Sequence, residues 1–149
     1  MPQNVPPVIK QVSFSEPAFA HCFRIRLEVF VAEQNVPLEE ERDEYDKTAL
    51  HFLAMLDGIA TGTARVVLKD TGAVAKISRV AVSKSARGLG IGAALIRHIE
   101  NAVDSSQFLL DAQTHALVFY ERLGYATYGE AFMEAGIPHR HMQKTRPAA

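Results

Sequence analysis

The chain has little of what would tie it to a membrane, to nucleic acid or to an oxidising compartment. It contains a single cysteine, Cys22, so an intramolecular disulfide is excluded. Its 16 basic and 17 acidic side chains leave a formal net charge of -1, and no global positive field is available to attract nucleic acid. No run approaches the roughly 20 apolar residues of a membrane helix. Residues 1–7 lack the charged start and apolar run of a secretory signal, so a cytoplasmic protein is expected.

The composition is that of one packed domain spanning residues 1–149. The hydrophobic fraction is 48% and the charged fraction 22%, both ordinary for a globular protein of this length. Neither an internal repeat nor a linker interrupts the chain. The flanks of Cys22 look helical and partly apolar, which favours a buried, unreactive thiol over a nucleophile.

The first part of the chain predicts a strand and a helix. Residues 8–14 are rich in Val, Ile and Phe and are typical of a strand. An amphipathic helix follows, because four apolar residues recur at i, i+4, i+8 and i+11: Phe19, Phe23, Leu27 and Phe30. Pro37 ends this pattern. The highly charged residues 38–48 form either a short helix or ordered loop, or a solvated surface segment.

The rest of the chain alternates between strand and helix patterns. Turn signals at Asp57-Gly58 and at residues 70–72 separate three consecutive antiparallel strands within residues 50–82. The remaining elements are expected as a helix at 91–103, a strand at 107–112, a helix at 114–123 and strands at 125–132 and 139–144. This order predicts an α/β (α+β) fold with a central, mixed but mostly antiparallel sheet of six to seven strands and about four helices.

The most informative segment runs from Ser78 to Gly92, where a buried strand leads into a loop with glycines at 88, 90 and 92. Glycine lets a ligand approach the backbone closely, and the helix that starts here offers unpaired N–H donors and partial positive charge. Such a loop can bind a phosphate or pyrophosphate, or it can simply be a tight connection. Neither the dinucleotide fingerprint nor the P-loop pattern is present, which argues against NAD and nucleoside triphosphates.

Two motifs resemble those of the GNAT acetyltransferases. Arg87, Gly90 and Gly92 match the acetyl-CoA signature Gln/Arg-x-x-Gly-x-Gly/Ala, placed directly after the strand that ends at Val82. Downstream, the segment Ala116 to Tyr125 resembles the family pattern Ala-x-x-Phe-Tyr-x-x-x-Gly-Phe. The N-terminal part and residues 136–139 are similar to a bacterial branch of predicted acyltransferases, so the resemblance covers nearly the whole chain.

The resemblance implies where the cofactor and the general acid lie. The pantetheine arm of acetyl-CoA would pair with the strand end Val80, Ala81 and Val82 like an added strand. The backbone amides of Arg87, Gly88, Leu89, Gly90, Ile91 and Gly92 would hold its pyrophosphate. Gln113 stands where many members have an asparagine near the cofactor. Tyr120 matches the frequent general acid, although its helical position also suits a packing role.

The general base is not identified by the resemblance. Histone-type members have a glutamate at the position of Lys76, and lysine is a poor base unless burial lowers its pKa. The alternatives are water or one of five side chains, each of which fits a surface charge, a helix cap or a structural pair better than a catalytic base: Glu33, Asp43, Asp46, His51 and Asp111. The first four of these are also the expected contacts of the acceptor, together with Arg79. Arg79 would face the acceptor or pair with the acidic run 39–46, and that run would attract a cationic amine or form a solvated face.

The expected function is transfer of an acetyl group from acetyl-CoA directly to a primary amine of a small molecule or peptide. The alternative is a coenzyme A-binding sensor or interaction module without turnover. No metal is expected, because His139 and His141 alone are a weak metal pattern. A homodimer through the C-terminal strands is an expectation by analogy with the family.

Overall fold

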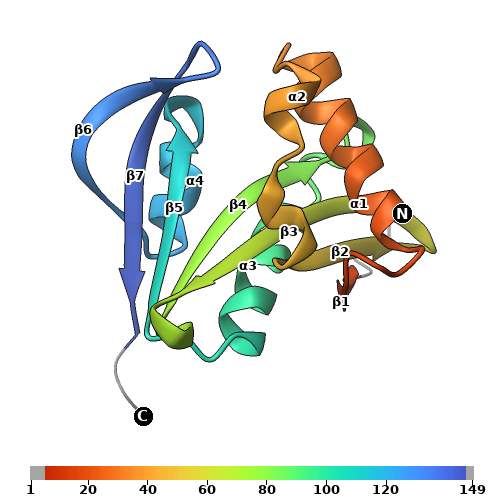
Figure 1. Cartoon of the computed structure of the whole chain (residues 1–149), viewed down its shortest axis with the longest axis horizontal. Coiled ribbons are helices and arrows are strands. Elements are labelled where there is room, and N and C mark those ends of the chain that lie inside the picture. The colour runs from red at the N-terminus through yellow and green to blue at the C-terminus, as the bar shows by residue number, and fades with distance from the viewer. Residues whose placement is uncertain (1–5, 147–149) are drawn as a thin grey trace.

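The computed structural model describes residues 6–146, which form a seven-stranded sheet with helices on both faces (Figure 1). The strands are β1 Val8–Val12, β2 Leu50–Leu56, β3 Ile59–Lys69, β4 Val74–Val82, β5 Gln107–Gln113, β6 Ala126–Glu134 and β7 Ile137–Thr145. The α-helices are α1 Phe19–Arg26, α2 Leu38–Glu41, α3 Ile91–Ala102 and α4 Leu117–Arg122. A π-helix, Leu27–Glu33, extends α1, and short 3-10 turns occupy Glu44–Lys47, Asp70–Gly72, Lys84–Ala86 and Thr114–Ala116.

The strands lie in the order β1-β2-β3-β4-β5-β7-β6, and every neighbouring pair is antiparallel except β4 and β5. The β2–β3 hairpin turns at Asp57 and Gly58, whose φ angles of 51° and 76° are the left-handed values that this tight turn requires. The predicted fold class, the mixed and mostly antiparallel sheet and the number of helices are confirmed.

The core has two layers because successive strand residues point to opposite faces of the sheet. On one face, α3 buries four residues against Phe52 and Phe108: Ile91, Leu95, Ile96 and Ile99. On the other face, α1 buries Cys22 and Ile25 against Leu53, the neighbour of Phe52 in β2. Burial raises the pKa of the Cys22 thiol, which agrees with the predicted unreactive cysteine.

The apolar stripe predicted on the first helix is not the face that the helix buries most. Phe19, Phe23, Leu27 and Phe30 are only half-buried, whereas Cys22, Ile25, Arg26 and Val29 are buried. The helix is rotated because the Arg26 guanidinium points inward to two carboxylates. The helix also changes at Leu27 from α to π geometry, which alters the spacing on which the stripe was based.

The charged segment after Pro37 is ordered and partly internal. It forms α2 and the 3-10 turn Glu44–Lys47, as the sequence predicted for a short helix or loop. The alternative of a fully solvated segment is wrong, because Glu41 and Asp46 are each only 2% exposed. Within residues 6–146, no helix combines the length and apolar character needed to span a membrane.

Candidate functional site

A cavity opens where the parallel strands β4 and β5 separate. The two strands pair only from Val74 to Ile77, against Gln107–Leu110, and then diverge (Figure 1). Past that point they flank a cavity of about 940 Å³. The cavity wall also includes the end of the π-helix, the acidic segment (residues 39–46) and the β6–β7 turn. The divergence therefore places residues of β4, of β5 and of three further segments around one space large enough for a ligand.

A β-bulge in β4 accompanies this divergence. Thr63 of β3 is opposite Ala81, and Arg65 is opposite Ser78, so Ala64 alone faces both Arg79 and Val80. Arg79 adopts a left-handed φ of 53° inside the strand. Val80, Ala81 and Val82 all line the cavity. The strand end predicted to bind pantetheine therefore lines the cavity, next to an interruption in the hydrogen bonding between β3 and β4.

The glycine loop follows directly from this strand end. Gly90 precedes α3 with a φ of 81°, a conformation that favours glycine, and a Cβ there would meet no protein atom within 4 Å. Arg87 lines the cavity, while residues 88–92 form the adjoining loop and the first turn of α3. The Ile91 side chain is buried in the core, so only its main chain is available to a ligand. The unpaired N–H groups of this first turn suit an anion.

Arg87 is tied to the π-helix by an ion pair. Its Nη2 lies 2.7 Å from Glu33 Oε1, and its Nε donates to the Val82 carbonyl at 3.1 Å. The hydrogen bond from Arg87 lowers the pKa of Glu33, so this carboxylate stays ionised at neutral pH. Glu33, predicted as an acceptor contact, lines the cavity but lies beside the glycine loop.

Tyr120 projects from α4 into the cavity wall. It is 8% exposed, and its ring packs edge-on against Phe119 at 4.9 Å between ring centroids. Burial raises the pKa of Tyr120 to about 12, so its hydroxyl keeps its proton at physiological pH. The side chain therefore packs against its neighbour and also borders the cavity.

Asp111 lies at the point of divergence with both oxygens engaged. Oδ2 accepts from Lys76 Nζ at 3.0 Å, and Oδ1 accepts from His141 Nδ1 at 2.6 Å. Burial opposes ionisation, but the bonds from His141 and Lys76 outweigh it and lower the pKa of Asp111. A carboxylate held in this way is a poor proton acceptor. Lys76 is correspondingly half of an ion pair with Asp111.

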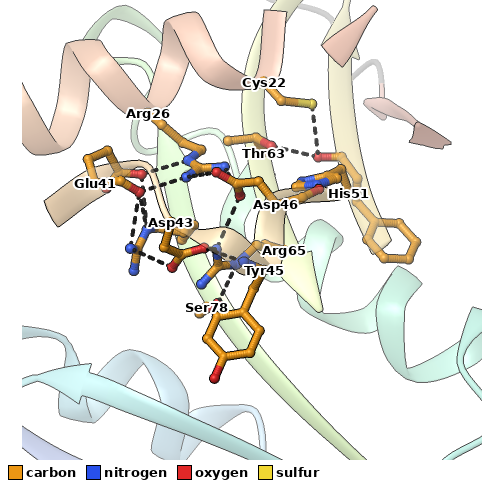
Figure 2. A network of polar contacts seen from close by, with 12 residues as sticks. Cys22, Arg26, Glu41, Asp43, Tyr45, Asp46, His51, Thr63, Arg65 and Ser78 are labelled. Carbon is orange, nitrogen blue, oxygen red and sulfur yellow. Dashed lines mark hydrogen bonds and ion pairs between the residues drawn. The ribbon is translucent and has the colours of Figure 1, made fainter. Parts of the chain in front are cut away.

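Three carboxylates of the acidic segment are paired with arginines, of which Figure 2 labels Arg26 and Arg65. Glu41 accepts from Arg26 Nε at 2.6 Å and from Arg79 Nε at 2.9 Å. Asp43 accepts from Arg65 Nη1 at 2.6 Å, and Arg79 Nη2 lies 3.3 Å from its other oxygen. Arg79 therefore pairs with the acidic segment, one of the two roles considered for it, although it also lines the cavity.

Asp46 and His51 lie behind this network, and neither is among the residues that line the cavity. Asp46 accepts from Arg26 Nη1 at 2.8 Å; burial opposes its charged form, but Arg26 and Arg65 outweigh this and lower its pKa. His51 Nε2 donates to the Asp46 carbonyl at 2.8 Å, and burial lowers the pKa of the imidazole. We therefore reassign both from predicted acceptor contacts to the structural support of the segment.

Gln113 ends β5, lines the cavity and pairs with Gln34. Its Nε2 donates to Gln34 Oε1 at 2.8 Å, and its Oε1 accepts from Gln34 Nε2 at 3.4 Å and from His115 Nε2 at 2.6 Å. Gln34 follows the π-helix, so this amide pair joins residues 79 positions apart. Gln34 was missed from the sequence, since nothing local to it signals a partner on β5.

Other cavity residues were also missed because they come from remote segments. They include Phe30 from the π-helix, Tyr45 from the acidic segment, Lys69 from β3, Glu134 from β6 and His139 from β7. The Tyr45 side chain extends away from the ion-pair network (Figure 2), and half of its surface is exposed. Over residues 6–146, no cluster of three His, Cys, Asp or Glu side chains is arranged to hold a metal ion.

Comparisons with known proteins agree with this geometry. The family model described as "Acetyltransferase (GNAT) domain" matches residues 11–146. The uncharacterised N-acetyltransferase YjcF of Bacillus subtilis is 38% identical over 137 residues, which cover 89% of this chain and 96% of that protein. The crystal structure of Escherichia coli ElaA has a TM-score of 0.79 at 27% identity, with 93% of this chain and 99% of that chain covered. An acyl-CoA N-acyltransferase from Pseudomonas aeruginosa has a TM-score of 0.80 at 27% identity, with 94% and 100% covered.

Proposed function

This chain belongs to the GNAT acetyltransferase family, and from that membership we propose that it transfers the acetyl group of acetyl-CoA directly to a primary amine of a small molecule or peptide. The observation that carries the proposal is the cavity between β4 and β5, which joins a bulged strand end to a glycine loop at a helix N-terminus. Because acetyl-CoA is a metabolite of the cell interior, we also propose a cytoplasmic location.

The cofactor follows the main chain from β4 to α3. The pantetheine arm pairs with Val80, Ala81 and Val82 as an extra strand, in the gap left where β5 turns away. The pyrophosphate lies on the amides of residues 87–92, where the unpaired donors and the helix dipole favour negative charge. The Gln113 amide turns from Gln34 towards the pantetheine.

The reaction is a direct displacement at the thioester. The amine nitrogen attacks the carbonyl carbon, a C–N bond forms, and the C–S bond breaks. The Val80 amide stabilises the developing oxyanion, and the Tyr120 phenol donates its proton to the departing thiolate. The proton lost by the amine passes to cavity water, because the three candidate bases that line the cavity as carboxylates, Glu33, Asp43 and Asp111, are each paired with a cation. Water also returns a proton to Tyr120 after the thiolate has left.

Calorimetric titration with acetyl-CoA, with NADH and ATP as controls, tests the cofactor assignment. Saturable binding of acetyl-CoA alone is expected, and amines are then screened by release of the coenzyme A thiol. Binding without transfer to any amine would favour a coenzyme A sensor, for which the Lys76–Asp111 ion pair in place of a basic glutamate is the supporting observation. No binding of any acyl-CoA would refute the proposal.

A further inference from the structure

Arg79 is held in a backbone conformation that an arginine disfavours. Its φ of 53° lies in the left-handed region, although it sits inside the nine-residue strand β4. Residues with a Cβ pay an energetic cost for this conformation, and they keep it only when the surroundings compensate. The contacts of the Arg79 side chain can supply this compensation.

The guanidinium of Arg79 is bound by the acidic segment from several directions. Nε lies 2.9 Å from Glu41 Oε2, and Nη2 lies 3.3 Å from Asp43 Oδ2. Nη2 also donates to the main-chain carbonyls of Glu41 at 3.1 Å and Glu40 at 3.2 Å. Four acceptors on one short segment thus fix the side chain of a strand residue about 38 positions further along the chain.

The carboxylates of Glu41 and Asp43 are themselves held by other arginines (Figure 2). Arg26, which is 1% exposed, bonds to Glu41, and Arg65 bonds to both Asp43 and Ser78 of β4. Charge-assisted hydrogen bonds of this kind are stronger than neutral ones, and Arg26, Glu41 and Arg65 are buried. The acidic segment is therefore a rigid support for Arg79.

We propose that Arg79 is a positioning residue whose guanidinium, gripped by Glu41 and Asp43, holds β4 in the bulge that presents the Val80 main chain to the cavity. This inference rests on the proposed function, because the bulge matters to the extent that an acyl-CoA pairs with Val80–Val82. The segment that binds Arg79 also carries Tyr45 into the cavity wall. It therefore contributes both to the shape of the strand that pairs with the cofactor and to the wall of the space open to an acceptor. Arg79 acts through the backbone of Val80, without contacting the reacting atoms.

The test compares Arg79→Ala with Arg79→Gly. Both variants lose the guanidinium, but glycine adopts the left-handed conformation without strain. The Arg79→Ala strand should relax out of the bulge and bind acetyl-CoA about tenfold more weakly, as expected from the cost of that conformation for a residue with a Cβ. The Arg79→Gly protein should bind within about twofold of wild type. Calorimetric titration measures both.

Thr71 supplies a matched control pair. Its φ of 53° equals that of Arg79, but it lies in the exposed β3–β4 turn outside the cavity. Thr71→Ala and Thr71→Gly should therefore bind acetyl-CoA alike. An equal loss of acetyl-CoA affinity in the two Arg79 variants would mean that the guanidinium contacts a ligand. Unchanged affinity in both would mean that the bulge does not depend on the Arg79 side chain. Either result overturns the proposal.

Crystal structures of the unliganded Arg79 variants separate this inference from the proposed function. A positive φ at position 79 is expected in Arg79→Gly and a negative φ in Arg79→Ala, whether or not acetyl-CoA binds. A positive φ in both would overturn the inference even if wild type binds the cofactor. If Arg79→Ala does not fold, Asp43→Asn is used in its place. Asp43→Asn should weaken acetyl-CoA binding in the wild-type chain and have no effect on binding in the Arg79→Gly chain. An equal effect in both chains would refute the proposal.

Discussion

The two strands that flank the cavity are supported in opposite ways. The β4 side is backed by buried ion pairs, in which Arg26, Glu41 and Asp46 are each at most 2% exposed. The β5 side ends in neutral hydrogen bonds among Gln113, Gln34 and His115, which are partly buried or exposed. Beyond β5, most residues of β6 are exposed.

This difference corresponds to two tasks in the proposed reaction. The β4 side carries the backbone that pairs with the cofactor, and its geometry must be in place before the cofactor arrives. The β5 side carries side chains that rearrange when the cofactor enters and that adapt to the acceptor. We therefore expect substitutions behind β4 to affect folding strongly, and substitutions at the end of β5 to change affinity slightly.

The largest effect is expected from Arg26→Ala. It leaves Glu41 and Asp46 buried without their main partner, and breaking a buried pair in this way costs about 3–5 kcal/mol of unfolding free energy. Gln34→Ala, on the opposite side, should cost only about 1 kcal/mol, the usual value of a hydrogen bond. Urea unfolding of both variants measures the difference. Similar costs would show that the two sides are supported alike.

Tyr120→Phe should lower the transfer rate by about 100-fold and leave acetyl-CoA affinity unchanged, because the phenol acts on the leaving thiolate. Since burial raises the pKa of Tyr120 to about 12, the wild-type rate should show no fall from loss of this proton up to about pH 10. Steady-state rates from pH 6 to 10 check this. Tyr128→Phe, outside the cavity, is the control, and an equal effect of both substitutions would remove Tyr120 from the mechanism.

Gly90→Val should weaken acetyl-CoA binding by about tenfold or more, because a branched side chain disfavours the left-handed conformation and crowds the pyrophosphate. Gly58→Val is the matched control: its φ is 76°, and like Gly90 it has no atom within 4 Å of an added Cβ, but it lies in the β2–β3 hairpin. Calorimetry should show weaker binding in the first variant only. Unchanged affinity in Gly90→Val would refute the placement of the pyrophosphate.

The smallest effects are expected at the amide pair. If Gln113 leaves Gln34 to bind the pantetheine, Gln34→Ala should raise acetyl-CoA affinity about two- to threefold, and Gln113→Ala should lower it about fivefold, in keeping with one hydrogen bond. Opposite signs for two residues that contact each other would be strong evidence for an exchange of partners. Loss of affinity in both would instead mean that the pair holds the cavity open.

The backbone side of the site could be predicted from the sequence, because its signals are local. The glycine pattern of Arg87 to Gly92 follows its strand within a few residues, and Asp57-Gly58 specifies its own hairpin. A turn or a helix N-terminus depends on the conformations of neighbouring residues, which the local sequence controls. The resemblance to the family added the role of Tyr120, which stays a prediction.

The side-chain partners could not be predicted in the same way. Arg26 meets Asp46 at a separation of 20 residues and Gln34 meets Gln113 at 79, and no local pattern encodes such pairs. The acidic segment shows the consequence, because a run of carboxylates has the same composition whether it faces solvent or three arginines. The π-helix could not be predicted either, because the spacing of apolar residues does not distinguish its wider turn from that of an α-helix.

Hydrogen exchange with and without saturating acetyl-CoA tests the central claim most directly, because it reports on backbone amides along the whole chain. The proposed function predicts slower exchange in peptides covering residues 80–82 and 87–92 and unchanged exchange in β6. Protection confined to other segments, or no protection at saturating acetyl-CoA, would contradict binding between β4 and β5.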